Sequence, residues 1–170
     1  MSEYAILPAG IPGHLEASTG TAAGSPTAAL ILVVGFDGSG PAQRALDAAV
    51  RIVYQRHGRL EIVYVSGESA AKAPSSESIT EGDGIADETA RQLSVKVRTV
   101  LEHREERWQF HHRKGERHDQ LLAAADEIRD HPDKHGGNTI VIVVGNDRRT
   151  AGPVTTRLLR ESPYPLVLVP

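Results

Sequence analysis

The sequence predicts an α/β fold in which a doubly wound, five-stranded parallel sheet carries helices on both faces. Apolar runs rich in β-branched residues, such as IVIVV at 140–144, show no polar alternation, which is typical of strands buried on both faces. Segments with apolar residues at helical spacing separate these runs. The elements therefore alternate β-α-β-α-β-α-β-α-β, which is the pattern of a parallel sheet with crossover helices.

The first part of the predicted domain is a β-α-β unit. Residues 30–36, LILVVGF, form an apolar strand, residues 42–57 a helix with one apolar side, and residues 60–65, LEIVYV, a second strand. Ser39 is placed as the N-cap of the helix and Gly58 as its C-terminal cap. The Ser-, Ala-, Glu- and Gly-rich residues 66–84 predict a long surface loop.

The remaining elements repeat this alternation. We expect a helix over 85–104, a charged edge strand over 107–112 that ends before Gly115, and a helix over 116–129. A Gly-bearing loop, 145–153, joins the strand at 140–144 to a helix that begins at Pro153, and the last strand is 166–169. Because open α/β sheets bind ligands at the carboxyl ends of their strands, loop 145–153 is the first candidate site.

Length and composition restrict the class of protein. The 170 residues predict one domain, 30–170, after a flexible extension over 1–29 that is rich in Ala, Gly, Ser, Thr and Pro. The net charge of −3 argues against a nucleic-acid partner, and the absence of cysteine excludes disulfides, zinc–thiolate sites and thiol catalysis. Since no apolar run could span a bilayer and no signal peptide is evident, we expect a cytoplasmic protein with no membrane partner.

No motif for catalysis or metal binding is present. The sequence lacks a P-loop, a G-x-G-x-x-G fingerprint and a G-x-S-x-G elbow around Ser39, so a nucleotide hydrolase is the least favoured function. Several histidines lie close together in the sequence, but the neighbours His111 and His112 point to opposite faces of a strand. We therefore predict no catalytic residues and no metal ligands.

Three segments, taken in order, resemble the universal stress protein family over about residues 29–170. The first strand ends in FDGS at 36–39, similar to the family's hydrophobic-Asp-x-Ser element. The strand at 140–144 ends in VVG at 143–145, and SPYPLVLV at 162–169 is similar to the family's small-Pro-x-Pro-hydrophobic finish. The resemblance implies a parallel sheet of order 3-2-1-4-5.

The resemblance also implies a nucleotide site. Family members that bind ATP hold the adenosine with the aspartate after the first strand and the backbone at the end of the second, which correspond to Asp37 and Val65. Their phosphates lie on a loop of the pattern G-x2-G-x9-G-[ST]. Gly145 matches the first glycine and Gly152 the last, and we expect the glycine at 145 to let a phosphate approach the backbone.

This loop departs from the family pattern. Arg148 stands where the second glycine is expected, with Arg149 beside it, and Gly152-Pro153 arrives early and lacks the hydroxyl. Pro153 also lacks the N–H that a phosphate would accept as a donor. The two arginines either replace these donors through their planar guanidinium groups or simply face solvent. Asp37 is likewise either a nucleotide contact or a cap of its turn.

We therefore predict a stress-response module that binds ATP, with or without Mg2+, through Asp37, Val65, Gly145, Arg148, Arg149 and Gly152. The alternative is a dimeric interaction module that has lost nucleotide binding.

The last strand predicts how two chains would assemble. In the implied strand order it lies at a sheet edge, and it is apolar and uncharged, which makes it an open pairing template. The family resemblance also implies homodimers. We expect a two-fold homodimer with antiparallel pairing of Leu166, Val167, Leu168 and Val169.

Overall fold

The computed structural model describes residues 29–67, 79–102, 108–130, 138–147 and 151–170, with only the backbone described for 79–83, 85 and 86. Apart from residue 29, the predicted N-terminal extension lies outside these ranges. The strands are β1 (Leu30–Gly35), β2 (Arg59–Ser66), β3 (Trp108–Lys114), β4 (Thr139–Gly145) and β5 (Leu166–Val169). They form one parallel sheet in the order β3-β2-β1-β4-β5, which confirms the predicted fold class and topology.

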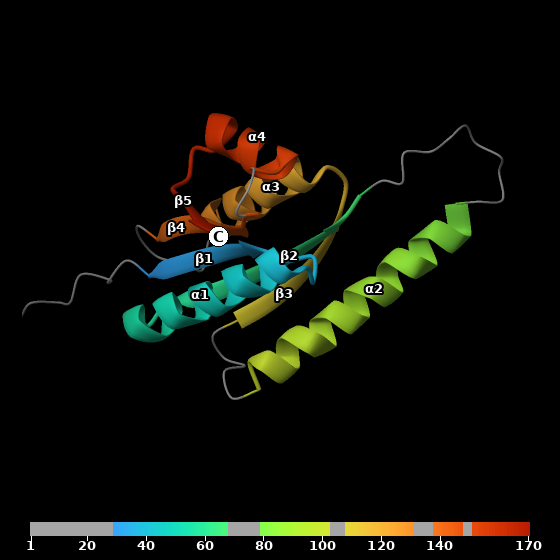
Figure 1. Cartoon of the computed structure of the whole chain (residues 1–170), viewed down its shortest axis with the longest axis horizontal. Coiled ribbons are helices and arrows are strands. Elements are labelled where there is room, and N and C mark those ends of the chain that lie inside the picture. The colour runs from blue at the N-terminus through green and yellow to red at the C-terminus, as the bar shows by residue number, and fades with distance from the viewer. Residues whose placement is uncertain (1–28, 68–78, 103–107, 131–137, 148–150) are drawn as a thin grey trace, which may run out of the picture.

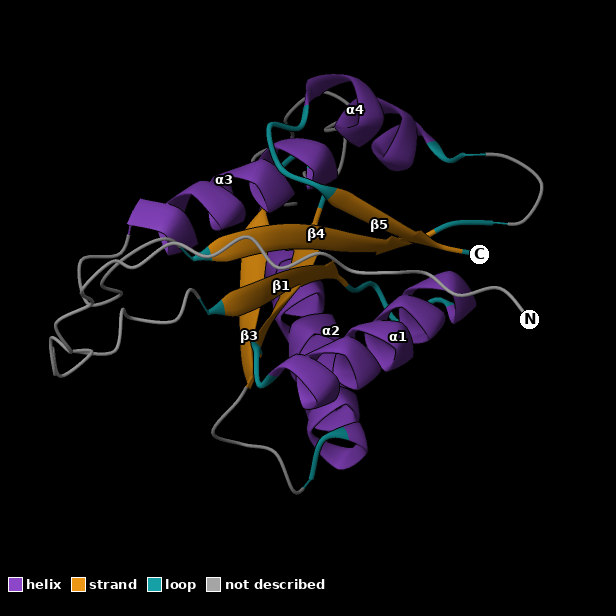
Figure 2. Cartoon of the chain, turned by 90° about the vertical axis from the view of Figure 1, so that its left-hand side faces the viewer, coloured by secondary structure: helices purple, strands orange, loops and turns teal. Residues whose placement is uncertain are grey.

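Helices cover both faces of this sheet (Figures 1 and 2). Helices α1 (Gly40–Arg56) and α2 (Ile79–Val100) lie on one face, and α3 (Arg117–Asp130) and α4 (Pro153–Glu161) lie on the other. Along β1, Leu32 and Val34 belong to the first core, while Ile31 and Val33 belong to the second. Because successive side chains of a strand point to opposite faces, a strand covered on both sides has to be apolar throughout.

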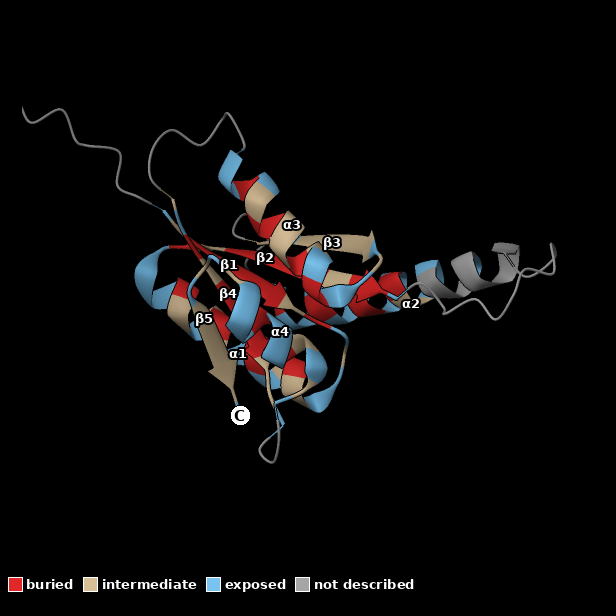
Figure 3. Ribbon diagram, turned by 90° about the horizontal axis from the view of Figure 1, so that it is seen from above, coloured by how far each residue is buried: buried red, intermediate tan, exposed pale blue. Residues whose placement is uncertain are grey.

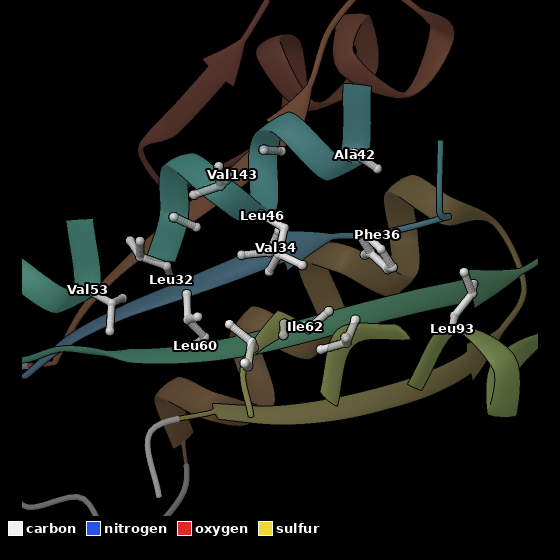
Figure 4. Close-up of a cluster of buried hydrophobic side chains, with 14 residues drawn as sticks. Leu32, Val34, Phe36, Ala42, Leu46, Val53, Leu60, Ile62, Leu93 and Val143 are labelled. Carbon is white, nitrogen blue, oxygen red and sulfur yellow. The ribbon is translucent and has the colours of Figure 1, made fainter. Parts of the chain in front are cut away.

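The hydrophobic core is thickest at the three central strands. Figure 4 shows the cluster beneath α1 and α2, where Leu32, Leu46 and Ile62 meet across β1, α1 and β2. Burial is highest along β1, β2 and β4, whereas β3 and β5 are half-buried at the two edges (Figure 3). Within the described ranges, none of the helices combines the length and apolar character needed to cross a bilayer.

Most element ends differ from the predicted bounds by one or two residues, and two helix ends differ in a way that has a physical reason. His57, not Gly58, adopts the left-handed conformation (φ 52°) that ends α1, and the N–H of Gly58 donates to Val53 O at 3.1 Å. Glycine is required at position 58 by a close approach instead, since a Cβ there would lie 2.6 Å from the carbonyl oxygen of Leu30. Helix α2 begins at Ile79, so the predicted loop 66–84 is too long, because an established helix extends at low cost even through polar residues.

Candidate functional site

A cavity of about 570 Å³ opens at the carboxyl ends of the central strands. Its apolar lining comes from the sheet and from α3, and includes Val63, Val65, Val144 and Leu121. Its polar lining comes from the segments where α1, α3 and α4 begin, all of which lie at this end of the sheet (Figure 1). The strand order reverses between β1 and β4 at this point, which is where open α/β sheets bind ligands.

The turn after β1 holds Asp37 at the cavity. Gly38 has a φ of 79°, a conformation that favours glycine, and a Cβ there would lie 2.6 Å from Leu93. Asp37 Oδ1 accepts a hydrogen bond from Ser39 N–H at 3.0 Å, and Ser39 Oγ accepts one from Ala42 N–H at 3.3 Å. One carboxylate oxygen of Asp37 therefore stabilises the turn, and Ser39 caps α1 as predicted.

The second carboxylate oxygen of Asp37 faces a cation, Arg117, that was not among the predicted site residues. Arg117 Nη1 lies 3.5 Å from Asp37 Oδ2, and both residues line the cavity. Their side chains are 54% and 38% exposed, so this ion pair contributes little to stability. A guanidinium in a long, exposed pair can exchange its partner at small cost.

Val65 presents its backbone to the cavity. Ser66 O accepts from Gly115 N–H on the β3 side at 3.0 Å, and Val63 O accepts from Phe36 N–H on the β1 side at 2.9 Å. Because successive residues of a strand direct their backbone groups to opposite neighbours, Val65 faces the β1 side. The β1 strand has already ended there, so the backbone of Val65 faces the space beyond it.

Gly145 lines the cavity, but a phosphate is not what requires a glycine there. A Cβ at this position would lie 2.1 Å from the carbonyl oxygen of Pro41 and 2.8 Å from the nitrogen of Ala42. Glycine at 145 thus allows the end of β4 to contact the first turn of α1 backbone to backbone. The substitution Gly145→Val would disrupt this packing, and it is not a clean probe of ligand approach.

The start of α4 contains a hydroxyl group that the loop pattern in the sequence did not predict. Gly152 is the N-cap and makes no side-chain cap hydrogen bond, and Pro153 follows it in the first turn. Thr155, two residues further on, is only 5% exposed and lines the cavity. The hydroxyl absent at Pro153 is therefore present one half-turn later in the same helix.

Asn146 is a further polar residue at the cavity. Its N–H donates to Val169 O at 2.7 Å, which fixes the residue just beyond the end of β4. Its Oδ1 is buried, and no partner for this atom is found in the described part of the chain. Buried amide oxygens are normally hydrogen-bonded, so this oxygen is available to a ligand.

The cavity brings together four of the six predicted site residues. Asp37, Val65, Gly145 and Gly152 all line it. Arg148 and Arg149 lie outside the described residues.

The described histidines make structural contacts away from the cavity. His111 Nε2 lies 2.7 Å from Glu61 Oε2, and Arg59 Nε lies 2.6 Å from Oε1 of the same carboxylate, which is 1% exposed. His118 is buried between Asp119 and Glu161, joining α3 to α4. No group of three or more metal-ligating side chains with the geometry of a metal site is found within the described ranges.

His112 forms a chain of contacts like that of a serine hydrolase. Its Nε2 lies 2.9 Å from Ser66 Oγ, and its Nδ1 lies 3.6 Å from Asp87 Oδ1. However, Ser66 is 7% exposed, does not line the cavity, and its hydroxyl also contacts Arg113 O at 3.2 Å. A buried hydroxyl that already has a backbone acceptor is a strand-end contact, and a nucleophile must be open to substrate.

Comparison of the sequence with models of protein families identifies the family of this chain. The model described as "Universal stress protein family" matches residues 30–170. The chain belongs to this family. No curated protein matches the sequence.

Solved structures of other universal stress proteins share the fold. UspA from Lactobacillus plantarum is 18% identical with a TM-score of 0.66, and the match covers 84% of this chain and 99% of that one. A family member from Burkholderia pseudomallei is 26% identical with a TM-score of 0.62, covering 82% and 95%. A universal stress protein in complex with cAMP is 21% identical with a TM-score of 0.58, covering 85% and 99%.

Proposed function

We propose that this universal stress protein is a stress-response module that binds an adenine nucleotide, ATP being the first to test, in the cavity at the carboxyl ends of β1 and β4. The observation that carries the proposal is that Asp37, Val65, Gly145 and Gly152, which come from three separate segments of the chain, line one cavity. The solved family member with bound cAMP supports the choice of ligand class.

The lining of the cavity suits the base and the ribose. An apolar surface with a few fixed polar groups is typical of small-molecule sites. Val63, Val65 and Leu121 offer apolar contacts to a purine, and the backbone of Val65 offers hydrogen bonds at its edge. Within the described residues the partner of Asp37 Oδ2 is the exposed Arg117 at 3.5 Å, so this oxygen can accept a hydrogen bond from a hydroxyl or amino group.

For the phosphates, we propose Arg148 and Arg149, with or without Mg2+. A site dominated by these charges should weaken as salt is raised, because exposed charges are screened. The double substitution of both arginines by alanine should then cost affinity for ATP and spare adenosine. If the double variant lost the same affinity for ATP and for adenosine, the two arginines would not be phosphate ligands.

Equilibrium titration of ATP, with and without Mg2+, tests the proposed function. Asp37→Ala should weaken ATP and adenosine alike, whereas Asp47→Ala, which removes an exposed carboxylate of α1 outside the cavity, should change neither. If the wild-type protein binds neither ligand, or if Asp37→Ala binds as well as wild type, nucleotide binding at this cavity is refuted.

A second function, a dimeric interaction module, is supported by β5. This strand pairs with β4 on one side only, and its four apolar residues are half-buried. Pro165 O accepts a hydrogen bond from Ile142 N–H at 3.0 Å, and Val169 O accepts one from Asn146 N–H at 2.7 Å. Backbone groups of alternate residues in a strand point the same way, so the N–H and C=O groups of Val167 also face β4. The outward backbone groups therefore belong to Leu166 and Leu168.

Because the backbone groups of Leu168 point away from β4, a substitution at this residue tests dimerisation. Leu168→Pro removes an outward N–H, whereas Leu168→Ala loses the same side-chain packing and keeps that N–H. Sedimentation at micromolar concentration should show a dimer for wild type and Leu168→Ala and a monomer for Leu168→Pro. A wild-type monomer excludes the dimer, and a Leu168→Pro dimer moves the interface to another surface.

A further inference from the structure

A buried histidine connects the start of α3 to the end of α4. His118 is the second residue of α3, and its side chain is 5% exposed. Its Nδ1 lies 2.6 Å from Asp119 Oδ1 on the same helix, and its Nε2 lies 3.0 Å from Oε2 of Glu161, the last residue of α4. Each ring nitrogen therefore faces a carboxylate, and the two carboxylates belong to different helices.

This arrangement is favourable at both ring nitrogens only when the ring is charged. A neutral imidazole has one N–H, so its other nitrogen presents a lone pair to a carboxylate oxygen, whereas an imidazolium has an N–H at both positions. Nε2 is buried and has no aligned hydrogen bond within the described residues, although Glu161 Oε2 is 3.0 Å away. The attraction between His118 and Glu161 therefore depends on the charge of the ring.

The charges around His118 also balance only when its ring is protonated. Arg157 Nη2 lies 3.7 Å from both Asp119 Oδ1 and Glu161 Oε2, so a single arginine faces two carboxylates. Glu161 ends its helix, where the helix dipole disfavours a negative charge, so it gains from a nearby cation. Other charged side chains of α3 and of the strands beneath it have partners of their own: Asp37 for Arg117, Arg113 for Glu127, Arg59 and His111 for Glu61, and Arg129 for Asp126.

The contact between His118 and Glu161 lies beside the cavity. Helices α3 and α4 lie next to each other on one face of the sheet (Figures 1 and 2). Arg117 and Leu121, before and after His118 in α3, line the cavity, as do Val154 and Thr155 in the first turn of α4. Because α4 has only nine residues, releasing its last residue changes how its first turn lies at the cavity.

We propose that His118 is a proton-sensitive clamp, which holds the end of α4 against the start of α3 when the ring is protonated and releases it when the ring is neutral. Histidine changes its charge between about pH 5 and pH 8, a range in which ordinary carboxylates stay ionised. The clamp is therefore closed at the acid end of this range and open at the alkaline end, and the wall of the cavity changes with it. This regulation goes beyond the proposed function, and its test needs no nucleotide.

A double-mutant cycle at two pH values tests the clamp. His118→Gln and Glu161→Gln, alone and together, are unfolded in urea at about pH 5.5 and about pH 8. The coupling between the two positions should change the unfolding equilibrium constant about tenfold at the lower pH and by less than about twofold at the higher. His111 and His112 titrate in the same range, but the cycle cancels what all four proteins share. The control is His57→Asn, at an exposed histidine that ends α1, which should show no coupling to Glu161→Gln at either pH.

Equal coupling at the two pH values, or no coupling at the lower one, overturns the clamp. If His118→Gln does not fold, Glu161→Gln decides alone, since its side chain is 44% exposed. It should raise the unfolding constant about tenfold at the lower pH and leave it within about twofold at the higher, and the same loss at both overturns the proposal.

NMR tests whether the clamp reaches the cavity. In the wild type, the amides of Val154 and Thr155 should shift with the same pH midpoint as the ring of His118, and Glu161→Gln should abolish this shift. Amides that stay constant while the ring titrates, or that shift equally in Glu161→Gln, overturn the proposal.

Discussion

The contact between Gly145 and the first turn of α1 should be among the least tolerant places in the fold. In Gly145→Ala the new Cβ would lie 2.1 Å from the carbonyl oxygen of Pro41 and 2.2 Å from its carbonyl carbon, where ordinary contact begins at 3.4 Å. The two backbones must therefore separate by roughly the difference, about 1.3 Å. Neither can yield freely, because Gly145 ends a buried strand and Pro41 lies in a capped helix start.

Overpacking of this kind costs about 1–3 kcal/mol, and the rigid backbone on both sides puts Gly145→Ala at about 3 kcal/mol or more. That is a large part of the roughly 5–15 kcal/mol by which domains are stable. The matched control is Gly152→Ala in the same loop. Among the described residues its Cβ would meet nothing within 4 Å, so the substitution should cost less than about 1 kcal/mol, the range of a changed N-cap.

Urea unfolding followed by circular dichroism measures both variants. With a slope of about 1–3 kcal/mol per molar, Gly145→Ala should lower the midpoint by about 1 M or more, and Gly152→Ala by much less. If the two variants unfold at the same midpoint, the close approach to Pro41 does not explain the glycine.

Two further predictions concern ionisable groups. Glu61→Ala removes a buried carboxylate that Arg59 and His111 contact, and it should cost about 1–3 kcal/mol in urea unfolding because those half-buried groups lose their acceptor. Glu88→Ala on exposed α2 should cost less than about 0.5 kcal/mol, and similar losses for the two variants would contradict the burial argument. Desolvation, together with the hydrogen bond to Asp126, raises the pKa of Tyr164 from 10.0 to about 12. Because this folded-state pKa is raised, the contribution of Tyr164 to stability is complete below pH 10 and is lost as the pH rises towards 12. Tyr164→Phe should therefore flatten the fall in the free energy of unfolding between pH 10 and pH 12. It should also remove the phenolate absorbance that appears last in an alkaline titration. A late phenolate signal that survives Tyr164→Phe belongs to another tyrosine.

The fold could be predicted because its signals are local and repeated. The two innermost strands, β1 and β4, consist almost entirely of apolar residues, which is typical of strands that helices cover on both faces. The element ends were harder to predict, since His57 adopts the left-handed conformation expected of Gly58, and Gly58 is needed where the chain lies against Leu30. That constraint comes from a distant part of the chain, and no local pattern contains it.

The candidate site was predictable where a residue lies at or just beyond the end of a strand, as Gly145 and Asp37 do. Arg117 and Thr155 were missed because they lie inside helices, and a sequence pattern does not show which helical residues reach a cavity. The topology did contain a signal for Arg117. Helix α3 returns from β3 to β4, so it must begin at the carboxyl edge of the sheet, and its first residue lies beside the end of β1.

The close packing around Gly145 also bears on how a short loop can serve a ligand site. A long glycine-rich loop pays an ordering entropy when it closes on a phosphate. The polar groups that line this cavity lie instead on helices that are packed in place. The backbone contact at Gly145 holds α1 against β4, and His118 joins the start of α3 to Glu161 at the end of α4. Groups held by packing lose little freedom when a ligand binds, so polar groups on Arg117 and Thr155 need less ordering than groups on a long loop would.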